Sequence, residues 1–207
     1  ASLDAPRMQM VLEGQKLLSR TIEYAEYGRK KINELGWRSF GRELINKESI
    51  YNVDVTKLVI YVAHLNVSGY EIAKRLNKQY GVQMEFADPY SVLGIVSIGN
   101  VKKDLKKLIA ALYNIVRKPN ANGSAMLLGK LKMPDFTSEV VLSPREAAFA
   151  VTKKIPFKDA IGMVSAEVVS PYPPGIPLLV PGERITTQDY QYLQFLKMLG
   201  SRISGQD

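Results

Sequence analysis

"AEVVSPYPPGIPLLVPGERIT", residues 166–186, sets five prolines in an otherwise apolar run. Proline fixes its own φ and has no N–H to donate, so this run does not suit a central β-strand. A solvated proline-rich linker would not carry Ile176 and the apolar run 178–180. The stretch therefore predicts a stiff apolar loop of irregular backbone, with Glu167 at its entrance and Glu183 followed by Arg184 at its exit.

The composition is that of an ordinary globular protein. The chain has 207 residues, 46% hydrophobic and 23% charged, enough for one large or two small domains. No apolar run approaches the roughly 20 residues that span a bilayer, so we expect no membrane partner. With no cysteine and one histidine, His64, a thiolate or multi-histidine metal site is excluded. The lack of cysteine suits a reducing compartment, and we expect a cytoplasmic protein.

The positive charge is concentrated in the middle of the chain, where residues 61–138 carry 11 basic and 5 acidic side chains. Many of these lysines lie in VKKDLKKLIAALYNIVRK, residues 101–118, on the polar side of an amphipathic helical pattern. A nucleic-acid patch is one interpretation, and it predicts affinity that falls steeply with salt. Since no nucleic-acid motif accompanies the lysines, we favour a solvated helix face and no nucleic-acid partner.

Local patterns predict a mixed α/β (α+β) fold. Apolar spacing from Met10 to Leu35 predicts one helix of about 30 residues that ends at Gly36. A small β-α-β-β-α unit follows, with a strand at 57–62, a helix between Ser68 and Gly81, strands at 82–87 and 92–99, and the basic helix 101–118.

The last third of the chain begins with a well-marked helix start. Ser143, Pro144 and Glu146 have the spacing of an N-cap, a first-turn proline and a capping box. A strand is possible at 161–169, and a last helix is expected at 187–199 between Thr186 and Gly200. We divide the chain into four parts: a linking helix at 1–40, a small α/β domain at 41–118, a linker at 119–138 and a C-terminal segment at 139–207.

No constellation for chemistry is complete in these residues. Glycine-rich phosphate loops and nucleophile elbows are absent. Glu183 with Asp189 could serve as a general acid–base pair, although surface carboxylates are common and we do not favour it. His64 follows an apolar strand, which favours a structural role over a catalytic one.

The series ASLDAPRMQM, VVLSPREAAFA and AIGMVSAEVVSPYPPGIPLLVPGERIT resembles the C-terminal half of the pyridoxal-phosphate-dependent ornithine/lysine/arginine decarboxylases. The resemblance implies the small domain of an aminotransferase-like fold type I enzyme, followed by a loop-rich decarboxylase segment. It also implies pyridoxal phosphate as cofactor, a homodimer or higher oligomer, and a basic amino acid as substrate.

The same resemblance places the cofactor machinery outside this chain. Family members carry pyridoxal phosphate on a lysine in a Ser-x-His-Lys motif within an N-terminal domain, whereas His64 is followed by Leu65. We therefore expect that the chain is part of a longer protein, contains no catalytic residue and is inactive alone.

By the same resemblance, the proline-rich loop helps to close the active site. We expect Glu167 to bind the distal cation of the substrate, with a structural ion pair as the alternative for this residue. The active-site loop would comprise Ser165, Tyr172, Pro173, Pro174 and Gly175, and Glu183 with Arg184 would anchor it.

The function implied is decarboxylation of a basic amino acid in polyamine synthesis, with arginine slightly favoured over lysine or ornithine. The alternative is a non-catalytic ligand-binding or oligomerisation domain on the same scaffold.

Overall fold

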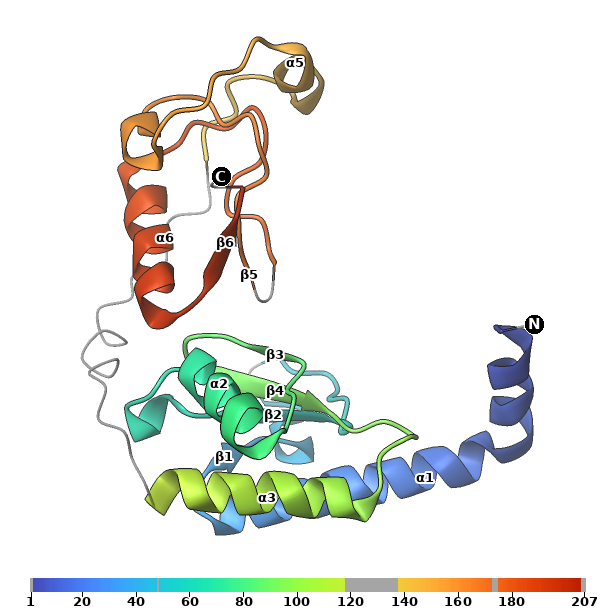
Figure 1. Cartoon of the computed structure of the whole chain (residues 1–207). Helices are drawn as coiled ribbons and strands as arrows, with labels where there is room; N and C mark the ends of the chain where they lie inside the picture. The colour runs from blue at the N-terminus through green and yellow to red at the C-terminus, as the bar shows by residue number, and fades with distance from the viewer. Residues whose placement is uncertain (1, 48, 118–137, 173–174, 206–207) are drawn as a thin grey trace.

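The computed structural model describes residues 2–47, 49–117, 138–172 and 175–205. Within them, a helix-covered sheet and a loop-rich C-terminal unit form two bodies (Figure 1). The mixed α/β class expected from the sequence is confirmed, and the prediction that Pro173 and Pro174 line the loop lies outside the described residues.

The first body contains a four-stranded antiparallel sheet in the order β1-β2-β4-β3. Its helices are α1 (Asp4–Glu34), α2 (Gly69–Tyr80) and α3 (Lys102–Arg117), with short 3₁₀ turns at Arg42–Leu44 and Ala63–Leu65. Its strands are β1 (Arg38–Ser39), β2 (Lys57–Tyr61), β3 (Phe86–Ala87) and β4 (Ser91–Ile95). The β-α-β-β-α order is thus confirmed, with β3 and β4 shorter than expected.

Alternation along β2 and β4 gives the sheet one buried face. Leu58, Ile60 and Val92 point into a core that also takes side chains from α1, α2 and α3. In α3 the leucines and isoleucines at 105, 108, 112 and 115 are buried, while Lys102, Lys103, Lys106 and Lys107 are exposed. The amphipathic pattern therefore packs as the sequence predicts.

The long first helix has two different halves. From Thr21 to Ile32 one face packs into the core of the sheet. Before that, the turns of α1 extend away from the sheet (Figure 1), and apolar side chains there are exposed: Leu3, Met8, Val11, Leu12 and Leu18. A helix with apolar residues on several sides is usually surrounded by protein.

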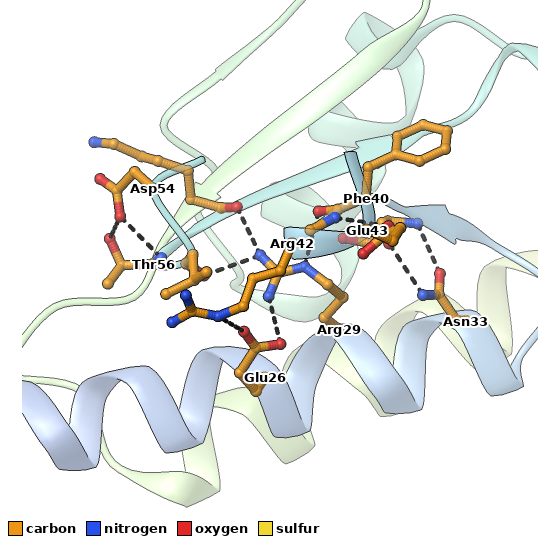
Figure 2. A network of polar contacts seen from close by, with 12 residues as sticks. Glu26, Arg29, Asn33, Phe40, Arg42, Glu43, Asp54 and Thr56 are labelled. Carbon is orange, nitrogen blue, oxygen red and sulfur yellow. Dashed lines mark hydrogen bonds and ion pairs between the residues drawn. The ribbon is translucent and has the colours of Figure 1, made fainter. Parts of the chain in front are cut away.

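A buried arginine joins α1 to the segment between β1 and β2 and to the first residue of β2 (Figure 2). Arg29 is only 5% exposed, and its guanidinium donates to the carbonyls of Phe40, Val55 and Lys57 and to Glu26, at 2.8–3.1 Å. A guanidinium has five donors in a rigid fork, so one side chain can satisfy the irregular segment 40–57 at several points.

Within residues 138–172 and 175–205, the second body contains two α-helices, a 3₁₀ turn and a two-stranded sheet. These are α5 (Pro144–Phe149), a 3₁₀ turn at Phe157–Ala160, α6 (Thr187–Leu199), β5 (Ser170–Tyr172) and β6 (Arg202–Ser204). The expected capping box is present at Ser143–Glu146, and Thr186, the expected cap of α6, forms a second one with Asp189. A separate core of Ala160, Val169, Leu178, Leu179, Ile185 and Leu193 lies between them.

Two expectations for this body are wrong. Residues 161–169 form no strand, because their backbone pairs only at single residues. Pro171 does lie in a strand, β5, opposite Ile203. Its carbonyl accepts from the amide of Gly175, and β5 is an edge strand of a two-stranded sheet, where a proline is tolerated.

The end of α6 joins the two bodies. Leu199 is buried in the core of the sheet, and its carbonyl accepts from the hydroxyl of Ser68 at 3.4 Å. Burial raises the pKa of the neighbouring Tyr70, although Ser201 hydrogen-bonds to it and lowers that pKa in part.

We predict that Arg29→Met lowers the free energy of unfolding by about 2–4 kcal/mol, because it leaves several carbonyls without their donor. The measurement is urea unfolding followed by the fluorescence of Trp37, the one tryptophan, which is buried in the same core.

Arg7→Met is the matched control, since Arg7 also pairs with an acid three residues away, Asp4, but is 62% exposed. An exposed pair of this kind contributes at most about 0.5 kcal/mol. Equal losses in the two variants would contradict the clamping role of Arg29.

Candidate functional site

The backbone of the C-terminal unit is held by three isolated antiparallel bridges. They pair Val140 with Glu183, Val164 with Arg184, and Val169 with Leu179. Buried backbone N–H and C=O groups need hydrogen-bond partners, and the prolines preclude a regular sheet here. The backbone therefore forms hydrogen bonds at single points between three segments: 139–142, 163–169 and 178–185.

Gly182 stands where two of these segments cross. Its carbonyl accepts from the amides of Val141 and Leu142, and its own amide donates to Ser165. Its φ is +98°, and a Cβ at this position would lie 2.1 Å from the carbonyl oxygen of Leu142. Glycine is therefore required here for both its backbone angle and its lack of a side chain.

The side chains of Glu183 and Arg184 turn to separate partners. Glu183 Oε2 accepts from the amide of Val180 at 2.9 Å. Arg184 donates to Glu139 at 2.6 Å and to the carbonyl of Gly162 at 2.7 Å. The hydrogen bond from Arg184 lowers the pKa of the Glu139 carboxyl, so the pair is intact at neutral pH and breaks only as the pH falls through that lowered pKa.

Glu167 combines a fixed backbone with a free carboxylate. Its amide and carbonyl both bond to the hydroxyl of buried Ser165. Its side chain is exposed and has no hydrogen bond or ion pair within the described part of the chain. The alternative expectation, a structural ion pair at Glu167, finds no partner among these residues.

The end of β5 and the turn that follows it carry two of the other predicted loop residues. Tyr172 is exposed, and Gly175 takes a φ of +86° while donating to the carbonyl of Pro171. The apolar residues of the loop differ in burial: Ile176 is exposed, whereas Leu178 and Leu179 are buried in the core of the unit.

The proposed acid–base pair of Glu183 and Asp189 is not supported. Glu183 is engaged with Val180, and Asp189, which is buried, accepts from the amide and hydroxyl of Thr186 in a capping box. Both carboxylates hold backbone turns, and no contact joins them in the described part of the chain.

His64 has structural contacts. Its ring stacks on Tyr61 with centroids 5.7 Å apart, and Nε2 lies 3.2 Å from the carbonyl of Gly36. Among the described residues no group of acidic or histidine side chains is arranged to hold a metal ion. Within the same ranges, no helix is both long and apolar enough to cross a membrane.

Sequence reasoning missed two residues of this site. Glu139 lies 45 positions from its partner Arg184, and no local pattern joins residues so far apart. Gly182 could be predicted as a turn residue from its Pro-Gly dipeptide, but its contact with Leu142 depends on the tertiary fold.

A protein-family comparison matches residues 130–205 to the family described as "Orn/Lys/Arg decarboxylase, C-terminal domain". This segment is an Orn/Lys/Arg decarboxylase C-terminal domain. The resemblance inferred from the sequence is confirmed, and the crossing at Gly182 and the segment around Glu167 both lie in this decarboxylase domain.

Relatives match nearly the whole chain. The arginine decarboxylase of Halalkalibacterium halodurans is 33% identical over 99% of this chain and 42% of its own length. That of Bacillus subtilis is 32% identical over 93% of this chain and 39% of its own length. The chain thus spans about two fifths of the length of these relatives.

Solved structures show the same fold. The lysine decarboxylase of Francisella novicida covers 93% of this chain with a TM-score of 0.71 at 19% identity, and 38% of that protein is matched. The constitutive lysine decarboxylase of E. coli covers 93% with a TM-score of 0.66, also at 19% identity, over 39% of its own chain.

We predict that Gly182→Ala destabilises the decarboxylase domain far more than Gly162→Ala. Both glycines have positive φ, but a Cβ at Gly162 meets nothing within 4 Å. Strain at positive φ costs about 1–2 kcal/mol at either site, and the contact with Leu142 adds about 1–3 kcal/mol at Gly182 alone. Thermal unfolding followed by circular dichroism compares the two, and equal losses would show that the crossing is not tight.

Proposed function

We propose that this chain is the C-terminal portion of a pyridoxal-phosphate-dependent decarboxylase acting on a basic amino acid, with arginine favoured. The matched family domain and the arginine decarboxylases similar over more than nine tenths of the chain support this proposal. The observation that carries the substrate assignment is the fixed backbone and unpaired carboxylate of Glu167.

The backbone on both sides of Glu167 is tied down. Before it, Ser165 exchanges hydrogen bonds with Gly182 and Glu183 at 2.8–2.9 Å, and after it Val169 exchanges them with Leu178 and Leu179. Fixing a segment this firmly costs conformational entropy, and a functional carboxylate benefits from such preorganisation.

A free carboxylate on a rigid segment suits the distal cation of a basic substrate. A guanidinium can donate two parallel hydrogen bonds to one carboxylate, whereas an ammonium acts as a point charge. Arginine is favoured further because the relatives named arginine decarboxylases are 32–34% identical, against 28% for the lysine decarboxylases of E. coli.

The chain does not supply the attachment site of the cofactor. The family lysine follows a histidine, but His64 is followed by Leu65 and is stacked on Tyr61. Pyridoxal phosphate, when bound, provides the electron sink for the loss of carbon dioxide. The residues of this chain would bind and orient the distal end of the substrate and help to exclude water.

A longer enzyme would also cover the exposed apolar turns at the start of α1, which contain Met8, Val11 and Leu12. We propose that they pack against a further domain, and that the enzyme is a homodimer or higher oligomer. Decarboxylation of a basic amino acid yields an amine of the class from which polyamines are made, so we place the enzyme in cytoplasmic polyamine synthesis.

We predict that the purified chain alone releases no carbon dioxide from arginine, lysine or ornithine with added pyridoxal phosphate, because it lacks the lysine motif. A radiometric carbon dioxide assay checks this. Release above the level of free pyridoxal phosphate would contradict the proposal.

The function is tested in a chimera in which this chain replaces the matching two fifths of the Halalkalibacterium halodurans arginine decarboxylase. We predict that Glu167→Gln lowers kcat/KM for arginine about 10- to 100-fold, because a charge-assisted hydrogen bond contributes about 1.5–3 kcal/mol. Citrulline, the neutral isostere of arginine, should be processed no worse than before, and the thermal midpoint should not change.

Glu183→Ala is the contrasting variant, since that carboxylate holds the amide of Val180. It should lower stability and affect both substrates alike. If Glu167→Gln instead keeps the preference for arginine and lowers stability, Glu167 has a structural role. If the chimera without this substitution binds pyridoxal phosphate but is inactive, a non-catalytic domain becomes the better interpretation.

A further inference from the structure

Ser165 is the one side chain that bonds to the backbone of Glu167 in the described part of the chain. Its hydroxyl donates to the carbonyl of Glu167 at 2.8 Å and accepts from the amide of Glu167 at 3.4 Å. Neither of these Glu167 backbone groups has a backbone partner among the described residues. The turn that carries the carboxylate is therefore closed by this hydroxyl.

The hydroxyl itself is held in place. Ser165 is 5% exposed, its amide donates to the carbonyl of Glu183 at 2.8 Å, and its carbonyl accepts from the amide of Gly182 at 2.9 Å. Ser165 thus connects the close crossing at Gly182 to the residue that presents the carboxylate.

The other side of the turn has backbone support only after Glu167. Val169 pairs with Leu179, and Gly205, at a φ of +82°, lies so close to Val168 that a Cβ there would be 2.3 Å from its carbonyl oxygen. Without the Ser165 hydroxyl, residues 166 and 167 would keep no hydrogen bond of their own to the rest of the domain among the contacts described.

We propose that Ser165 is a positioning residue for substrate selection, which fixes the turn so that the Glu167 carboxylate meets the distal cation of the substrate. This rests on the function proposed for Glu167. Displacement of a binding group by about 1 Å can remove a large part of its contribution to the reaction rate. Loss of the Ser165 hydroxyl should therefore weaken the contribution of Glu167 to substrate binding.

The test uses the same chimera and compares kcat/KM for arginine with kcat/KM for citrulline. Ser165→Ala should lower this ratio about 3- to 10-fold. The double variant Ser165→Ala with Glu167→Gln should have the same ratio as Glu167→Gln alone, because a positioning residue has no effect once its carboxylate has lost its charge.

Ser170→Ala is the matched control. Ser170 is also a buried serine, 7% exposed, in the neighbouring strand β5, but no contact links its hydroxyl to Glu167. It should leave the ratio unchanged. If Ser165→Ala lowers both substrates equally, or if its effect adds to that of Glu167→Gln, the positioning role is overturned.

The two proposals fail in different ways. If Glu167→Gln does not change the ratio, the substrate role of Glu167 is wrong. If Glu167→Gln lowers the ratio but Ser165→Ala does not, only the role of Ser165 is wrong.

Amide hydrogen exchange in the chain itself tests the turn independently of activity. Ser165→Ala should speed the exchange of the Glu167 amide about tenfold or more, while the amides of Ser165 and Val169 keep their protection. An unchanged exchange rate at Glu167 would show that the hydroxyl does not hold the turn.

Discussion

The close crossing of two backbone segments at Gly182 is the constraint on which the C-terminal unit depends. The carbonyl of Gly182 binds the amides of Val141 and Leu142, and its amide binds Ser165, so three parts of the chain are joined at one residue. Prolines remove donors throughout this region, and single-residue bridges take the place of a regular sheet. The unit can therefore be rigid although much of its backbone is irregular.

Short series of hydrogen bonds connect this crossing to the candidate site. Ser165 links the crossing to Glu167, while Glu183 and Arg184 hold the end of the proline-rich loop through Val180, Glu139 and Gly162. Arg29 plays a comparable part in the first body, where it satisfies carbonyls of an irregular segment. In both bodies, side-chain and backbone hydrogen bonds hold loops that have little regular structure.

Local signals made most of the fold predictable. Capping boxes at Ser143 and Thr186, and the left-handed glycines at positions 81 and 200, lie within a few residues of the helix ends that they define. The strand at Pro171 was not predictable, because it depends on which way one carbonyl points in the folded unit. For the same reason the contact of Glu139 with Arg184 and the partners of Glu183 and Asp189 follow from tertiary structure. Glu167 could be singled out from its place in the motif, but its unpaired state required the structure.

We propose that the domain holds the Glu167 carboxylate ready for the distal cation of a basic amino acid. A crystal structure of the chimera with bound pyridoxal phosphate and arginine tests this most directly. We expect the Glu167 carboxylate oxygens to lie about 2.7–2.9 Å from guanidinium nitrogens of the substrate, the distance of a charge-assisted hydrogen bond. A bound arginine whose guanidinium is held by other residues, with Glu167 turned to solvent, would contradict it.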